Sequence, residues 1–321
     1  MKGIFQKRFF VSIASAAVLL TLSASNVSVR TLCQGFVPKN DRYIPDDAKA
    51  LRDGGMTREQ FDSILDRVER IYGPIVQARG GVLNIQRKWD DGTVNASAER
   101  IGTTYRLNMY GGLARHPLIT PDGFMLVACH EMGHQVGGKP KVSSFFGGTS
   151  WASVEGQSDY FGTAKCMRKM FLSMTPDELA SFTSNSTYAE EQCATAFARK
   201  GSTAQTICVR NTLAGVTLGN VLSDLSGTGI VALETPTSAI YNGIDQRHPK
   251  AQCRLDTYFQ GALCRVAHDV DYSDSNYLQG ACAKESGDTV GLRSKCWFNP
   301  SRRTANKGVN QLRLPAHEVY Y

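Results

Sequence analysis

Beyond its first 22 residues, the 321-residue sequence lacks any apolar run of the roughly 18 residues that a membrane-spanning helix needs. The exception at the start is a nearly unbroken apolar stretch from Phe9 to Leu22. Basic side chains precede that stretch, and the small residues Ser23 to Ser25 follow it. This order is typical of a secretory signal peptide, so we expect residues 1–25 to be removed on export. An uncleaved signal anchor is the alternative.

The sequence also lacks clustered basic residues, internal repeats and low-complexity runs. Its formal net charge is +7, and removing the three cations of the expected signal peptide leaves +4 (7 − 3). Without a basic stripe, nucleic-acid binding is not supported. No strong linker divides the rest of the chain. We therefore expect residues 26–321 to form a single globular domain that has no membrane span and binds no nucleic acid.

Cysteine, by contrast, is abundant. The nine cysteines stand at 33, 129, 166, 193, 208, 253, 264, 282 and 296. Cysteines scattered behind an export signal indicate disulfides and a secreted or periplasmic location. An odd number leaves at least one cysteine free or paired with another chain. We expect Cys129 to be the free thiol, because it lies inside an apolar helix directly before His130.

Two statements about pairing follow from position. Cys253 and Cys264 are 11 residues apart in one predicted helix, which separates them by roughly 16 Å. A disulfide requires much closer Cα atoms, so these two cysteines should not pair together. Cys282 and Cys296 flank a loop rich in glycine and charge, across which a disulfide is plausible. The other pairings stay open at this point.

Hydrophobic periodicity and turn signals predict an α+β fold that is mainly helical. A capping box at Thr57 opens a first helix, which Gly73-Pro74 is expected to interrupt. A second helix begins with Thr120 as N-cap and Pro121 in the first turn, and Gly137 ends it. Strands are expected at 82–89, at 104–110 and once between them. Further helices are expected at 150–171, 176–183, 188–199, 203–224 and 249–267.

The pattern that points to chemistry is His130-Glu131-Met132-Gly133-His134. Residues four apart on a helix lie on one face, so His130 and His134 can meet one ion. Imidazole nitrogens suit Zn²⁺, which prefers tetrahedral nitrogen, oxygen or sulfur ligands. Glu131 beside that face can accept a proton from the water that the metal polarises. Two histidines packed inside a buried helix without metal are the alternative, but burying both beside Glu131 would be costly.

A catalytic zinc site takes three protein ligands and leaves a fourth position for water. Glu155, 21 residues after His134 on the next predicted helix, is the expected third ligand. Asp159 lies one turn further on the same face and can hydrogen-bond the distal nitrogen of a ligand histidine. We expect Gly156 to let the two helices approach closely. A solvated Glu/Asp pair on an amphipathic helix is the alternative interpretation.

These two motifs together resemble the gluzincin metallopeptidases, and within them look most like the HtpX and CaaX-prenyl-protease type family. His248-Pro249, with Arg254 six residues after the histidine, is similar to a later motif of that family. The resemblance covers roughly residues 104–260. It implies a zincin-like core with an active-site helix, a small β-sheet and further helices. Many members carry transmembrane helices and fewer cysteines than this chain. The resemblance therefore implies the fold of the core and the peptidase chemistry, but it does not identify a substrate.

The resemblance also gives roles to residues outside the two motifs. His248 or Arg254 would stabilise the oxyanion formed when water adds to a carbonyl, or His248 would occupy the open zinc position. A helix-start histidine and a structural salt bridge are the alternatives. A substrate strand would add to the sheet edge near Tyr105 to Tyr110.

The sequence as a whole predicts an exported zinc endopeptidase acting on proteins or peptides, with Glu131 as general base. Two other functions stay open. One is a non-enzymatic, disulfide-stapled periplasmic binding or assembly factor that keeps a zincin fold with a closed metal site. The other is a zinc hydrolase of a different amide bond, such as one in the cell wall.

Overall fold

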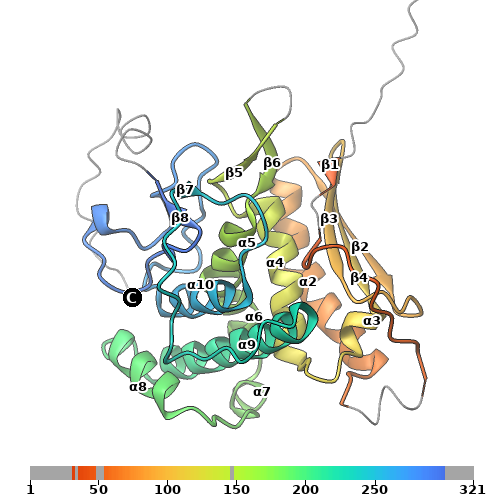
Figure 1. The fold of residues 1–321 in the computed structure, drawn as a ribbon, viewed down its shortest axis with the longest axis horizontal. Helices are drawn as coiled ribbons and strands as arrows, with labels where there is room; N and C mark the ends of the chain where they lie inside the picture. Colours follow the sequence, from red (N-terminus) through yellow and green to blue (C-terminus); the bar gives the residue numbers. More distant parts are fainter. Residues whose placement is uncertain (1–30, 33–34, 48–53, 145–147, 301–321) are drawn as a thin grey trace, which may run out of the picture.

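A helix through the middle of the molecule separates a small sheet from a group of helices (Figure 1). The computed structural model describes residues 31–32, 35–47, 54–144 and 148–300. The expected signal peptide lies outside these ranges. Within them the fold is α+β, as predicted, with several helices and small sheets. No helix in the described part of the chain is long and apolar enough to cross a membrane.

The main sheet has four strands in the order β1-β3-β4-β2. These are β1 (Thr31–Leu32), β3 (Ala96–Ile101), β4 (Thr104–Tyr110) and β2 (Val82–Lys88). β3 pairs antiparallel with β1 and β4, and β2 pairs parallel with β4. Because β4 is hydrogen-bonded on both sides, the predicted substrate edge near Tyr105 to Tyr110 is wrong. The strand beside the central helix is β3.

Helix α2 (Arg58–Ala78) covers one face of the sheet and begins with the predicted capping box at Thr57. The predicted interruption at Gly73-Pro74 does not occur, because the helix continues through Pro74. Tyr72 and Val76 lie on either side of this proline and are both buried in the core. Their burial offsets the cost of about 3 kcal/mol that a proline imposes inside a helix.

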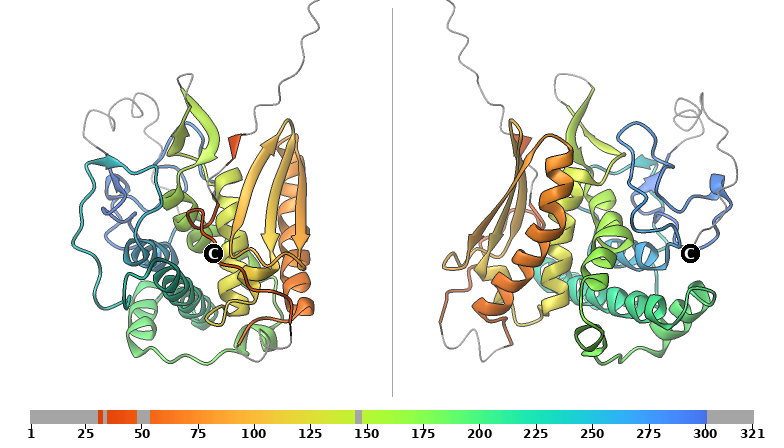
Figure 2. Two further views of the ribbon diagram at one scale, coloured as in Figure 1. Left: turned by 45° about the vertical axis from the view of Figure 1, so that its right-hand side comes forward. Right: turned by 180° about the vertical axis from the view of Figure 1, so that it is seen from behind.

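Helix α4 (Pro121–Val136) is the central helix, and the structure confirms its predicted ends. The hydroxyl oxygen of Thr120 accepts a hydrogen bond from the backbone N–H of Gly123, and Gly137 follows the last turn. Every residue from Gly123 to Val136 is buried. The sheet and α2 cover one side of α4, and further helices cover the other (Figure 2). A helix that is apolar on most faces requires such complete burial.

The segment after α4 differs from the prediction at its start. Residues 149–153 form strand β6 (Thr149–Ser153), paired with β5 (Lys141–Ser143), instead of the first turns of a helix. The helical part begins at Glu155, as α5 (Glu155–Phe161), and continues through a π-helical turn at Gly162–Cys166 into α6 (Met167–Leu172). Cross-strand pairing to Lys141 is a non-local interaction, so periodicity alone could not distinguish this strand from a helix start.

The remaining helices agree with the prediction to within a few residues. α10 packs against α9, α5 and the π-helical turn, and so reaches the residues around α4. The elements are α3 (Gly111–Ala114), α7 (Pro176–Ala180), α8 (Thr187–Ala196), α9 (Ser202–Ser226), β7 (Gly243–Ile244), α10 (Ala251–Leu263), η2 (Lys284–Ser286) and β8 (Phe298–Asn299).

Four disulfides join parts of the chain that are distant in sequence. They are Cys129–Cys166, Cys193–Cys208, Cys253–Cys296 and Cys264–Cys282. The prediction that Cys253 and Cys264 do not pair is confirmed, whereas the pairing of Cys282 with Cys296 is wrong. The assignment of Cys129 as the free thiol is also wrong, because α4 packs against the turn that carries Cys166. The ninth cysteine, Cys33, lies outside the described residues.

Removing the disulfide that joins α4 to the π-helical turn should destabilise the fold. Cys129→Ala combined with Cys166→Ala opens a loop with a sequence separation of 37. Chain entropy assigns about 4 kcal/mol to such a closed loop. We expect the free energy of unfolding, measured by chemical denaturation, to fall by roughly that amount. Cys193→Ala with Cys208→Ala opens a shorter loop, with a sequence separation of 15, and should cost less, about 3 kcal/mol. Equal stability of the wild type and the first double variant would contradict this expectation.

Candidate metal centre

The two histidines of α4 face one another across one helical turn. The Nε2 atoms of His130 and His134 are 3.0 Å apart. The other ring nitrogen of each is held by an acceptor: His130 Nδ1 donates to Asp159 Oδ1 at 2.7 Å, and His134 Nδ1 donates to the carbonyl oxygen of Ser153 at 2.8 Å. A proton fixed on each Nδ1 leaves both Nε2 atoms as metal donors directed at the same point.

Glu155, the first residue of α5, brings a carboxylate to this point. Its Oε2 atom lies 3.2 Å from His130 Nε2, and its Oε1 atom lies 3.6 Å from His134 Nε2. Ligands about 2.0–2.1 Å from a tetrahedral zinc ion are separated from each other by roughly 3.3 Å. The three buried side chains therefore have the spacing and the donor types that a zinc ion requires.

The charges of the cluster favour a cation. Burial lowers the pKa of His134 to about 4, so its imidazole is neutral and offers a lone pair. Burial alone would raise the pKa of Glu155, but the imidazoles of His134 and His130 outweigh it and hold that pKa well below its ordinary value. The carboxylate is therefore ionised. Burial would also lower the pKa of His130, but Asp159 raises it to about 9. Metal binding at His130 Nε2 must therefore displace a proton.

Glu131 is completely buried next to this cluster. Both of its carboxylate oxygens lack a hydrogen-bond partner among the residues that the structure describes. Burial raises the pKa of Glu131 to about 8. A buried carboxylate without partners is costly unless a cation or a water molecule compensates it. A divalent cation held by the neighbouring His130 and His134 would lower this pKa.

Asp159 and Arg254 support the cluster from behind. Asp159, one turn after Glu155 on α5, accepts the His130 hydrogen bond and two more from Arg254 on α10. The Arg254 Nε–Oδ2 and Nη2–Oδ1 distances are 2.8 and 2.7 Å, which is a bidentate ion pair. Both side chains are buried. The structure thus places Arg254 in a salt bridge that fixes Asp159, so it acts on the cluster as a positioning residue.

Removing the charge of Asp159, which orients His130, should lower the affinity of the site for zinc. Asp159→Asn preserves the shape of the side chain but removes the charge that orients His130 and pairs with Arg254. We expect zinc affinity, measured by competition with a chromogenic chelator, to fall by about 10- to 100-fold. Asp256→Asn on α10 changes another buried, hydrogen-bonded aspartate away from the cluster and should leave zinc affinity unchanged. Equal affinities of the two variants would remove Asp159 from the site.

His248 lies at the rim of the cluster, in the loop before α10. Its Nε2 atom is 3.5 Å from Glu155 Oε1 and 2.7 Å from the carbonyl oxygen of Gly35, to which it donates. The side chain also borders two cavities of about 320 and 340 Å³. The structure therefore places His248 beside Glu155, and it adds a contact with Gly35 that the sequence did not indicate.

The glycine at the contact between α4 and α5 is Gly133, and not Gly156 as the sequence suggested. A Cβ atom on Gly156 would meet the ring of Trp297 at 2.1 Å, so Gly156 makes room for that tryptophan and not for α4. The close approach of the two helices depends on Gly133, where a Cβ atom would lie 2.8 Å from the Cα of Ser158. Gly133 stands between the two metal-site histidines, so the spacing of the motif and the helix packing are linked.

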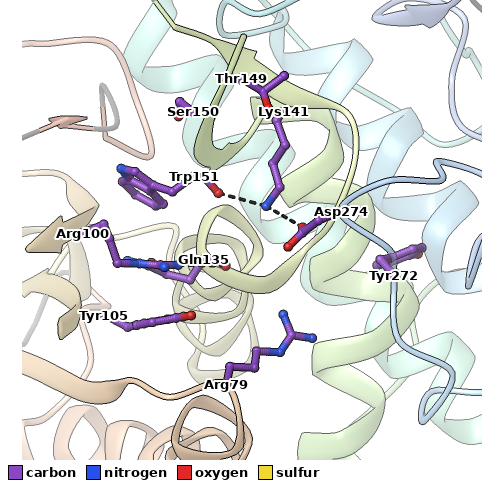
Figure 3. Close-up of a pocket in the computed structure, with 10 residues that line it drawn as sticks. All are labelled: Arg79, Arg100, Tyr105, Gln135, Lys141, Thr149, Ser150, Trp151, Tyr272 and Asp274. Atoms are coloured by element: carbon purple, nitrogen blue, oxygen red, sulfur yellow. Dashed lines mark hydrogen bonds and ion pairs between the residues drawn. The ribbon is translucent and has the colours of Figure 1, made fainter. Parts of the chain in front are cut away.

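Another cavity, of about 440 Å³, opens between the β3 end of the sheet and the β5–β6 hairpin (Figure 3). Three cationic side chains line it, and each has a partner. Arg79 pairs with Asp271, Arg100 donates to Gln135, and Lys141 pairs with Asp274. None of the side chains that form the metal cluster lines this cavity. Two of these contacts are ion pairs, and because no residue of the metal cluster lines the cavity, it does not take part in the chemistry described above.

Comparisons of the chain with protein-family models, with curated proteins and with solved structures find no match. The case for a function therefore depends on the site itself and on the sequence motifs that form it.

Proposed function

We propose that the chain is an exported zinc endopeptidase of the gluzincin type. The observation that carries the proposal is the convergence of His130, His134 and Glu155 on one point, next to the Glu131 carboxylate, which has no hydrogen-bond partner in the described part of the chain. A purely structural metal site needs no such base. A bound zinc ion would act as a Lewis acid that lowers the pKa of a water molecule and polarises a carbonyl group.

The chain's own residues have distinct roles in this proposal. Glu131 removes a proton from the attacking water and later delivers it to the departing amine. Asp159 and Arg254 hold the His130 ring in the tautomer that binds metal. His248 lies 3.5 Å from Glu155 and donates a hydrogen bond to the carbonyl oxygen of Gly35. It is therefore the candidate donor to the oxyanion that develops on a substrate carbonyl.

Other features support an exported protein. The four disulfides are consistent with an oxidising compartment, because cytosolic proteins rarely keep such bonds. The signal-peptide pattern of residues 1–25 points to the same route. The proposed location is thus outside the cytoplasm, in the periplasm or the medium, where the substrate would be a protein or peptide.

Incubating the zinc-loaded protein with casein, with and without a metal chelator, tests the proposal. We expect cleavage that the chelator abolishes and that added zinc restores. Absence of casein cleavage, together with release of amines from cell-wall peptide, would favour a hydrolase of another amide bond. Absence of any hydrolysis by fully loaded protein would favour a non-enzymatic binding or assembly factor.

A further inference from the structure

The N-terminal segment lies along the edge of the strand nearest the metal centre. β1 pairs antiparallel with β3, and the pairing continues where the Phe36 N–H donates to the carbonyl oxygen of Ala96 at 2.8 Å. The Asn95 side chain then bonds both backbone polar groups of Val37, at 3.1 Å each. Residues 35–37 thus lie along the edge of β3, held by one backbone hydrogen bond and by the Asn95 side chain.

The same three residues contact the metal-binding machinery directly. The Phe36 ring meets the edge of the His130 ring, with a centroid distance of 5.4 Å, and is fully buried. The carbonyl oxygens of Gly35 and Phe36 accept hydrogen bonds from His248 and Arg254, at 2.7 and 2.5 Å. Two consecutive main-chain carbonyls are therefore held by the side chains at the rim of the cluster and behind it.

The conformation at Gly35 is specific to glycine. Its φ angle is +91°, in a region that residues with a side chain rarely adopt. A Cβ atom there would also lie 2.9 Å from the carbonyl oxygen of Ala96. The sequence Gly-Phe at 35–36 is therefore what allows the chain to turn a carbonyl toward His248 while the next side chain packs on His130.

The result is a closed site. His130, Glu131 and His134 have no exposed surface, and Glu155 is only 4% exposed. A peptide substrate must reach these groups, so whatever covers them must move. The segment at 35–37 contacts His130 through the Phe36 ring and His248 through the Gly35 carbonyl oxygen.

We propose that Gly35–Val37 covers the metal centre where a substrate would bind, so that a substrate must displace this segment and the basal rate of hydrolysis by the wild type is low. This inference rests on the proposed peptidase function, because it identifies the segment with a substrate. The self-contact also indicates the preferred substrate chemistry: a peptide whose aromatic side chain packs on His130, after a carbonyl that His248 binds.

Two variants and one control test the inference in the full chain. Gly35→Ala introduces a side chain where φ is positive, and Phe36→Ala removes the ring that covers His130. Asp41→Ala changes an exposed residue of the same segment and serves as the matched control. The first readout is the rate at which a chelator removes zinc, which requires no enzymatic activity. We expect release at least roughly ten-fold faster in the first two variants than in the control.

The second readout is hydrogen exchange in the wild type with the probe phenylalanine hydroxamate, which binds zinc through its hydroxamate group. The probe should accelerate exchange of the Phe36 amide without affecting amides shared by β3 and β4. Unchanged exchange at saturating probe would overturn the inference, and so would equal zinc release in variants that keep circular dichroism and thermal stability. If zinc release is faster in the two variants but neither they nor the wild type cleave casein, the inference about residues 35–37 stands and the proposed peptidase function is rejected.

Discussion

Glu131→Gln is expected to reduce casein hydrolysis by about 100- to 10,000-fold while the zinc content stays at the wild-type value. The amide that replaces the carboxylate has nearly the same shape but cannot accept the proton of the attacking water. Glu131 is buried and has no hydrogen-bond partner among the described residues, so the substitution breaks no contact that holds the fold. Because its raised pKa keeps Glu131 largely uncharged at neutral pH in the absence of metal, the substitution should leave thermal stability near the wild-type value.

The exposed Glu190 of α8 offers a matched control, because Glu190→Gln makes the same chemical change on the surface. Its hydrolysis rate should equal that of the wild type. If Glu131→Gln keeps its hydrolytic activity, Glu131 is not the general base. Loss of zinc in that variant would instead mean that Glu131 is a metal ligand.

Glu155→Ala is the second variant with a large expected effect. Its carboxylate lies 3.2 and 3.6 Å from the two Nε2 atoms and supplies the negative charge of the donor set. Zinc sites built from several ligands bind with about 10–16 kcal/mol, so losing one of three protein ligands costs several kcal/mol. We expect zinc affinity to fall roughly 100-fold or more, since each 1.4 kcal/mol is a factor of ten.

This loss is measured by metal analysis after dialysis against a chelator of intermediate affinity. Wild type and Glu190→Ala should keep one equivalent of zinc, and Glu155→Ala should keep little. A full equivalent of zinc in Glu155→Ala would show that another donor completes the site. Hydrolysis is expected to fall in parallel with the zinc content.

Much of the candidate site was predictable because its determinants are local. The four-residue spacing of His130 and His134 on one helix is a local property, and so is the one-turn spacing of Glu155 and Asp159 on the next. Caps such as Thr120 give helix ends to within a residue for the same reason. The chemistry of imidazole and carboxylate groups then narrows the choice of metal.

Features that depend on contacts between distant segments were not predictable. Thr149 and Ser153 belong to a strand because Ser143 and Lys141 of β5 pair with them, although the pattern of this segment resembles a helix start. Cys129 forms a disulfide because α4 meets the turn carrying Cys166. The sequence Gly35-Phe36 has no periodicity that relates it to His130, and only the path of the chain along β3 brings them together. A glycine before an aromatic residue in an irregular stretch was the only available signal.

The most direct test of the metal centre is a crystal structure with diffraction data collected on both sides of the zinc absorption edge. The account predicts one anomalous peak, about 2.0–2.2 Å from His130 Nε2, His134 Nε2 and one oxygen of Glu155. A peak elsewhere, or a peak on the two imidazoles with the Glu155 carboxylate turned away, would contradict it.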